Sequence, residues 1–286
     1  MVITDLFDPA RHEALSGAPW SDAAARDAVA RVVASTLAEY QPDLGWLTHP
    51  LDDPETPDER VCPLYHGAGG VVLALRHLAR RGAAADLPDF TPLVAGLYPR
   101  HHPEIVKARH GSASWMLGDV GIDLLHWTMA PEEALLQRLH ASILGNLHNT
   151  AREALWGNPG TVLAAIHLAE WTGEPRWAAL VRQAADVLEA ELERDEVLGA
   201  WLWVQDLYGR PGQKMLGAGH GFVGNVFPFL RGAALLPAEQ VGRMMDRALQ
   251  TLQATALRAE GAANWPPDAH PVPDRPRKLL VQDCHG

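Results

Sequence analysis

The residues of this chain that could do chemistry stand beside glycines that recur along the sequence. His66 and His220 each precede such a glycine, and Cys284 is followed by His285 and a further glycine. A histidine can transfer protons near neutral pH. A cysteine thiolate is a nucleophile, whereas a protonated cysteine commonly serves as a small buried apolar side chain. The sequence therefore offers proton-transfer and thiol chemistry at repeated positions.

The glycine-rich strings that carry these residues form a repeat. They are LYHGAGG at 64–70, WMLGDVG at 115–121, LWGNPG at 155–160, GHGFVG at 219–224 and DCHG at 283–286. The first four share a Gly-x-x-Gly core, and successive strings lie about 40–65 residues apart, the length of a helix pair. A glycine at the start of a helix lets the backbone approach a neighbour closely. A crowded centre would need this at every repeat.

Two kinds of predicted helix alternate between these strings. Short helices that are apolar on most faces are predicted at 66–78, 113–127, 160–171 and 220–230. Longer helices with a charged stripe at helical period are predicted at 22–40, 131–148, 174–195 and 237–258. Apolar helices must be buried and amphipathic ones must cover them, which predicts inner and outer rings of helices, an α/α toroid. An irregular helical bundle or an α-solenoid would also satisfy this periodicity.

Four segments lack the helical pattern. Residues 1–20 are predicted to be irregular, and the proline-rich stretches 41–63 and 261–278 are predicted to be loops. Between the predicted helices 174–195 and 220–230, residues 198–219 contain a weakly alternating Trp-Leu-Trp-Val string followed by Gly-Arg-Pro-Gly, which indicates a small hairpin. We expect one domain over residues 1–286.

Composition and charge exclude several classes of protein. The 286 residues carry 24 basic and 35 acidic side chains, a net charge of −11. Neither an excess nor a cluster of basic residues is present, which argues against nucleic-acid and anionic-membrane partners. The sequence contains no apolar run of about 18 residues, which is the length that a membrane-spanning helix needs. It also does not begin with a basic segment followed by an apolar one, so a cytoplasmic location is expected. The two cysteines, Cys62 and Cys284, exclude a disulfide scaffold.

Taken together, the ordered strings resemble those of the lanthionine synthetase C-like (LanC-like) proteins, which include the lantibiotic cyclases. The strings that carry the resemblance are YHGAGG, LWGNPG, GAGHGFVGN, NWPP and VQDCHG, and they run from about residue 60 to residue 286. The resemblance implies an α/α toroid of seven helix pairs around a zinc ion. About five of these pairs fall within this sequence, which we therefore expect to be truncated at its C-terminus.

The resemblance also implies a reaction and its residues. LanC-like cyclases add a cysteine thiol across a dehydroalanine or dehydrobutyrine of a peptide, and relatives outside peptide biosynthesis use glutathione as the thiol. Cys284 matches the first zinc ligand of the family, His220 the acid/base histidine, and Glu153 the acidic residue near the site. Two features depart from the pattern. Asp283 replaces the tryptophan that usually precedes the first zinc cysteine, and the family's second Cys-His-Gly, which supplies two further zinc ligands, is missing.

Each candidate residue also has a structural explanation. Cys284 could be a buried apolar residue, His220 could bond a backbone carbonyl, and Glu153 could be an acid of the outer face because Arg152 adjoins it. The missing ligands motivate a first alternative function, a non-catalytic module that binds a peptide or glutathione.

The second alternative is a carbohydrate-processing α/α toroid. The ten tryptophans could form a sugar platform, and Asp119, Asp123 and Asp206 could supply a glycosidase's pair of carboxylates. We expect most of the tryptophans to serve packing, including Trp127, Trp171 and Trp177, whereas Trp203 and Trp265 could line a central bowl. The oligomeric state stays open.

Overall fold

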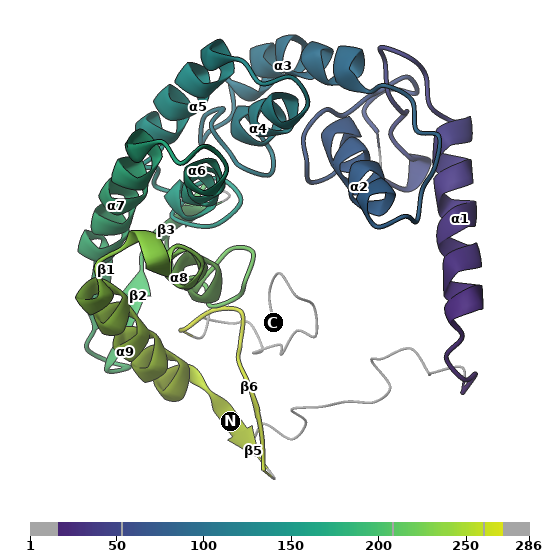
Figure 1. The fold of residues 1–286 in the computed structure, drawn as a ribbon. Coiled ribbons are helices and arrows are strands. Elements are labelled where there is room, and N and C mark those ends of the chain that lie inside the picture. The colour runs from purple at the N-terminus through teal and green to yellow at the C-terminus, as the bar shows by residue number, and fades with distance from the viewer. Residues whose placement is uncertain (1–16, 53, 208, 260, 271–286) are drawn as a thin grey trace.

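The computed structural model describes residues 17–52, 54–207, 209–259 and 261–270 (Figure 1). The protein is mainly helical, as predicted, with short antiparallel hairpins between some of the helices. Within this part of the chain, every helix is too short or too polar to traverse a lipid bilayer. The fifth glycine string, at 283–286, and residues 1–16 lie outside the described residues.

The helices form two layers of a curved array (Figure 1). The inner helices are α2 (Ala68–Arg80), α4 (Asp119–Met129), α6 (Asn158–Thr172) and α8 (Phe222–Arg231). The outer helices include α3 (Thr91–Ile105), α5 (Glu133–Gly145), α7 (Pro175–Ala190) and α9 (Ala238–Thr255), while α1 (Asp22–Ala38) lies near α2. Each inner helix contacts the next inner helix, and α4, α6 and α8 also pack against outer helices. The predicted alternation of inner and outer helices is therefore found, although Val223, Phe227 and Leu230 of the inner helix α8 are exposed.

Close backbone approach explains the repeated glycines. The inner helices begin directly after Gly67, Gly118, Gly157 and Gly221. Three residues further on lie Gly70, Gly121, Gly160 and Gly224. At each of these second glycines, a Cβ atom would overlap the backbone carbonyl oxygen six residues earlier, which belongs to the turn that leads into the helix. The same tight turn is thus built four times, and only glycine fits its second position.

The outer layer differs from the prediction in one helix. Helix α3 has Pro92 in its first turn and Pro99 and Pro103 inside it, so the sequence pattern does not predict a helix here. The side chains of its own residues Leu93, Val94 and Leu97 are buried, and they hold the helix in place. Packing therefore outweighs the helix-breaking tendency of the two internal prolines.

Hairpins join α7 to α8. Strands β1 (Leu192–Asp195) and β2 (Ala200–Trp203) pair antiparallel, as do β3 (Gln205–Leu207) and β4 (Arg210–Gln213). The hairpin prediction is confirmed, but it begins earlier than expected. Residues 192–195, predicted as the end of a helix, form a strand because the buried Asp195 carboxylate accepts the amides of Val197 and Leu198 and closes the turn.

The predicted loops are partly ordered by the core. The stretch 41–63 contains a 3₁₀ turn (η2, Pro50–Asp52), and its Trp46 packs with Tyr40 and Phe90 in an aromatic cluster. A second 3₁₀ turn, η3 (Ala233–Leu235), leads into α9. Strands β5 (Leu257–Ala259) and β6 (Ala262–Asn264) form a hairpin where a helix end and a loop were expected.

Candidate functional site

Glu153 and His220 lie together although 67 residues separate them in the sequence. Nδ1 of His220 donates to Oε2 of Glu153 at 2.9 Å, and both side chains are buried. Glu153 belongs to the turn that leads into α6, and His220 belongs to the turn that leads into α8. The pair therefore joins two neighbouring inner helices at the ends where they begin.

The turn before α6 fixes the Glu153 carboxylate. Its Oε2 accepts the Leu155 amide at 3.0 Å, and its Oε1 accepts the Trp156 amide at 2.5 Å. Amides only donate, so both oxygens of Glu153 act as acceptors, as they do in the ionised carboxylate. They also use the positive end of α6 to stabilise its negative charge.

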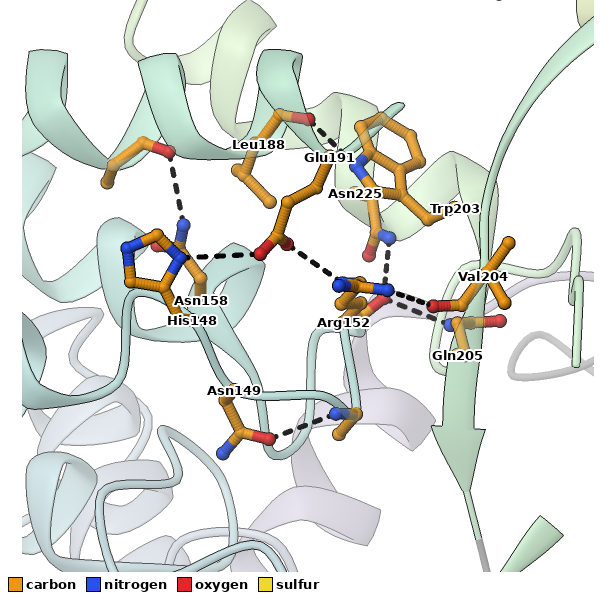
Figure 2. A network of polar contacts seen from close by, with 12 residues as sticks. His148, Asn149, Arg152, Asn158, Leu188, Glu191, Trp203, Val204, Gln205 and Asn225 are labelled. Carbon is orange, nitrogen blue, oxygen red and sulfur yellow. Dashed lines mark hydrogen bonds and ion pairs between the residues drawn. The ribbon is translucent and has the colours of Figure 1, made fainter. Parts of the chain in front are cut away.

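Arg152 faces the opposite way, which excludes an outer-face position for Glu153. Arg152 has a left-handed backbone (φ 44°), rare for a residue with a side chain. Its guanidinium donates to Glu191 Oε2 at 2.9 Å and to the Val204 carbonyl at 2.7 Å, between α7 and the hairpins (Figure 2). The reversal at Arg152 sends its own side chain outward and leaves Glu153 directed at His220.

Two buried amide side chains hold this backbone, and no feature of the sequence marks Gln205 as functional. Nε2 of Gln205 donates to the Arg152 carbonyl at 3.0 Å and to the His220 carbonyl at 2.6 Å. Asn225, within the GAGHGFVGN string, donates to the same Arg152 carbonyl at 2.7 Å (Figure 2). Gln205 thus holds the backbone of both turns that carry the pair. It lies in a hairpin, where the hydrophobic pattern of the sequence does not set it apart from its neighbours.

The hydrogen bonds also assign the tautomer of His220. With Glu153 ionised and accepting two amides, we assign the proton of the 2.9 Å contact to Nδ1 of His220. In the neutral ring, Nε2 is then the proton acceptor. A buried carboxylate behind a histidine in this tautomer suits general acid–base chemistry, because it stabilises the imidazolium that forms when Nε2 takes a proton.

A cavity of about 340 Å³ is lined by residues of the turns that carry the pair, although neither Glu153 nor His220 lines it. It is lined by Trp115, Met116, Ala154, Leu155, Leu163, Ala218, Gly219, Val223, Gly224 and Phe227. Ala154 directly follows Glu153 in the chain, and Gly219 directly precedes His220. The wall of the cavity is thus continuous with both turns that carry the pair.

The three aspartates considered for glycoside hydrolysis each pair with a different basic side chain. Asp119 accepts His102 Nδ1 at 2.6 Å, Asp123 forms a two-point ion pair with Arg138, and Asp206 pairs with Arg109. Each of these carboxylates is therefore bound to a basic side chain, and they do not form the two facing carboxylates of a glycosidase.

The tryptophans are divided differently from the prediction. Trp177 is fully buried and Trp127 is partly buried, as expected, but Trp171 is 49% exposed at the end of α6. Trp203, predicted to line a bowl, is buried, and its indole donates to the Leu188 carbonyl (Figure 2). Trp265 is half-buried and donates to the Leu252 carbonyl.

The described residues do not fit a zinc site. In residues 17–270, apart from positions 53, 208 and 260, no group of three or more His, Cys, Asp or Glu side chains could hold a metal ion. Cys284, the predicted ligand, lies outside the described residues. Cys62 is buried in an apolar cluster with Val72 and Phe90, and burial raises the pKa of its thiol, which favours the protonated form over a metal-binding thiolate.

Comparison with known proteins adds no assignment. Neither a scan against models of known protein families nor a search of curated proteins found a match to this chain.

Proposed function

We propose that this protein is a LanC-like α/α toroid and that its Glu153–His220 pair transfers protons when a thiol adds to a dehydroalanine or dehydrobutyrine of a peptide. The observation that carries the proposal is the 2.9 Å hydrogen bond between these residues. The resemblance marks both residues, Glu153 four positions before Gly157 and His220 directly before Gly221. The repeated inner turns and the two layers of helices support the toroid.

The addition needs one base and one acid, and the pair supplies both. Nε2 of His220 takes the thiol proton, and the thiolate sulfur forms a bond to Cβ of the dehydrated residue. The electron pair of the Cα=Cβ bond moves to the carbonyl oxygen as an enolate. The imidazolium then returns its proton to Cα, so the thiol has added across the double bond and His220 is neutral again. Glu153 stabilises the imidazolium between these two proton transfers.

Zinc stays a prediction of the resemblance. In the LanC-like proteins the metal stabilises the thiolate, and Cys284 is the residue of this chain that the resemblance assigns to it. Metal analysis of the purified protein tests the assignment. If Cys284 is a ligand, the Cys284→Ala variant loses bound zinc, and retention of stoichiometric zinc in that variant would contradict it.

The test of the function uses a synthetic peptide containing dehydroalanine, with glutathione or with a cysteine in the same peptide as the thiol. Mass spectrometry follows the glutathione adduct, and alkylation of the remaining free thiol follows the internal reaction. We expect Glu153→Gln to lower the rate at least about a hundredfold, because the amide cannot stabilise the imidazolium.

Asp119→Asn is the matched control, since Asp119 is the other buried carboxylate that accepts a histidine Nδ1. It should keep the wild-type rate per folded molecule. Equal rates in wild type and Glu153→Gln, or no addition by the wild type with either thiol, would reject the proposal. In the second case, peptide binding without turnover would favour the non-catalytic module instead.

A further inference from the structure

The cavity lined by residues of the Glu153 and His220 turns has apolar walls, which favour apolar ligands over polar ones. Its larger side chains come from three successive inner segments: Trp115 and Met116 before α4, Leu155 and Leu163 of the α6 segment, and Val223 and Phe227 of α8. All are apolar, and apart from the Trp115 indole none carries a strong hydrogen-bonding group. The remaining lining residues are alanines and glycines.

The shape of the cavity is fixed on one side and accessible on the other. The Trp115 ring stacks on His167 at 6.0 Å with an interplanar angle of 21°. Burial, with a smaller effect from Arg231, lowers the pKa of His167, so this ring is neutral near pH 7 and adds no charge to the wall. Val223 and Phe227 are 44% and 49% exposed. The lining thus combines an aromatic ring that stacks on a neighbouring histidine with two apolar side chains that a ligand can reach.

Resting on the proposed function, we infer that this cavity binds one large apolar side chain of the peptide substrate, because its wall includes residues of the two turns that carry Glu153 and His220. Its volume of about 340 Å³ is at the low end of the range for small-ligand pockets, ~300–1,000 Å³, so it suits one side chain with its adjacent backbone. Burying such a side chain here removes apolar surface from water on both partners.

The same lining disfavours the other candidate ligands. Glutathione carries two carboxylates and one ammonium group, and burying an unpaired charge against apolar walls is strongly unfavourable. If glutathione is the thiol, its charged groups must therefore lie outside this cavity. A sugar would leave its hydroxyl groups without partners on the lining side chains, which argues against a carbohydrate at this place.

The test measures binding without chemistry. Isothermal titration calorimetry compares two unreactive peptides in which alanine replaces the dehydrated residue, with leucine or aspartate as its neighbour. Maltotriose serves as the sugar probe. We expect the leucine peptide to bind at least about tenfold more tightly than the aspartate peptide. Maltotriose should not bind.

Phe227→Asp supplies a variant of the cavity itself. It places a charge in the wall at a half-exposed position, so the fold should tolerate it. The leucine peptide should lose at least about tenfold in affinity. Leu230→Asp is the matched control, because Leu230 is also on α8 and 55% exposed but does not line the cavity. It should leave the affinity unchanged.

The outcomes separate this inference from the proposed function. Equal affinities for both peptides, no binding of either, or no effect of Phe227→Asp would overturn the inference even if thiol addition is observed. Preferred binding of maltotriose would overturn it in favour of a sugar site. Selective binding of the leucine peptide, sensitive to Phe227→Asp but without any thiol addition, would retain the ligand class and reject the catalytic role.

Discussion

Two histidine–carboxylate pairs lie where inner helices begin, and their surroundings differ. His220 and Glu153 join the turns before α8 and α6, and other residues of both turns line a cavity. His102 and Asp119 join the outer helix α3 to the first residue of the inner helix α4, at 2.6 Å between Nδ1 and Oδ2. Both carboxylates are buried, and in both pairs the histidine Nδ1 is the bonded atom.

The second pair is part of a packed stack. His102 stacks on Tyr98 with ring centroids 4.9 Å apart, and the Arg138 guanidinium lies 3.9 Å from the Tyr98 centroid. Arg138 in turn binds Asp123 of α4 through two hydrogen bonds. These contacts tie α3, α4 and α5 together. Hydrogen bonding to a buried carboxylate is thus common to both pairs, and only the adjoining cavity distinguishes the first as a place for a reaction.

Position within the repeat decides which side of the inner layer a residue faces. Asp119 and Asn158 both follow the first glycine of their strings, and both bond an outer helix, Asp119 through His102 and Asn158 through the Ala184 carbonyl. Ser114 and Glu153 both stand four residues before that glycine, and both accept amides of their own turn. Only the longer Glu153 side chain accepts a histidine from the next turn as well.

The strongest way to break this comparison is to replace each histidine by asparagine. Asparagine keeps a donor for the carboxylate but cannot exchange a proton near pH 7. We expect His220→Asn to lower the rate of thiol addition about a hundredfold or more. His102→Asn should leave that rate within about threefold, because His102 serves packing. Equal losses in both variants, measured by mass spectrometry on folded protein, would contradict the distinction.

The glycine turns that carry the two pairs should be equally sensitive to a methyl group. Gly121→Ala and Gly160→Ala each place a Cβ onto a backbone carbonyl of their own turn, that of Trp115 or Ala154. We expect each to cost about 3 kcal/mol of unfolding free energy in urea titrations. Gly96→Ala is the control, since its Cβ would meet no atom within 4 Å inside helix α3. It should stabilise the protein by about 0.5–1 kcal/mol. A small cost at Gly160 would disprove the shared turn.

The smallest expected effect concerns the packed stack and depends on pH. Arg138→Met leaves the buried Asp123 without its partner, and we expect a loss of about 2 kcal/mol at pH 7. Burial raises the pKa of Asp123, and Arg138 partly opposes this. Without Arg138 the folded state therefore binds a proton more readily than the unfolded chain, so the loss should shrink as the pH falls from 7 towards 4.

Lys107→Met controls for the loss of a charge, since its ion pair with Glu104 is exposed on both sides. Its effect on stability should stay within about 0.5 kcal/mol at every pH. A loss in Arg138→Met that grows on acidification would show that Asp123 is not the group left unpaired.

Much of the helical pattern could be predicted because it is local. The apolar period of 220–230 and the glycine at 221 correctly predict an inner helix, which begins at Phe222. Helix α3 could not be predicted in this way, since its prolines oppose helix formation and only its buried leucines favour it. The strand at 192–195 was missed for a similar reason, because the Asp195 turn depends on contacts that periodicity does not contain.

The sequence by itself determined the inner turns, and the resemblance of its glycine strings to those of LanC-like proteins marked two residues of the candidate site. Gly-x-x-Gly is a steric requirement of the turn, so it is visible in the residues, and Glu153 and His220 stand at fixed offsets from it. The tertiary structure alone decided that the two side chains meet. Their meeting depends on the reversed backbone at Arg152, which Gln205 and Asn225 hold from other elements. It also decided that apolar residues of three separate segments enclose one cavity, because such proximity arises only when the inner helices pack side by side.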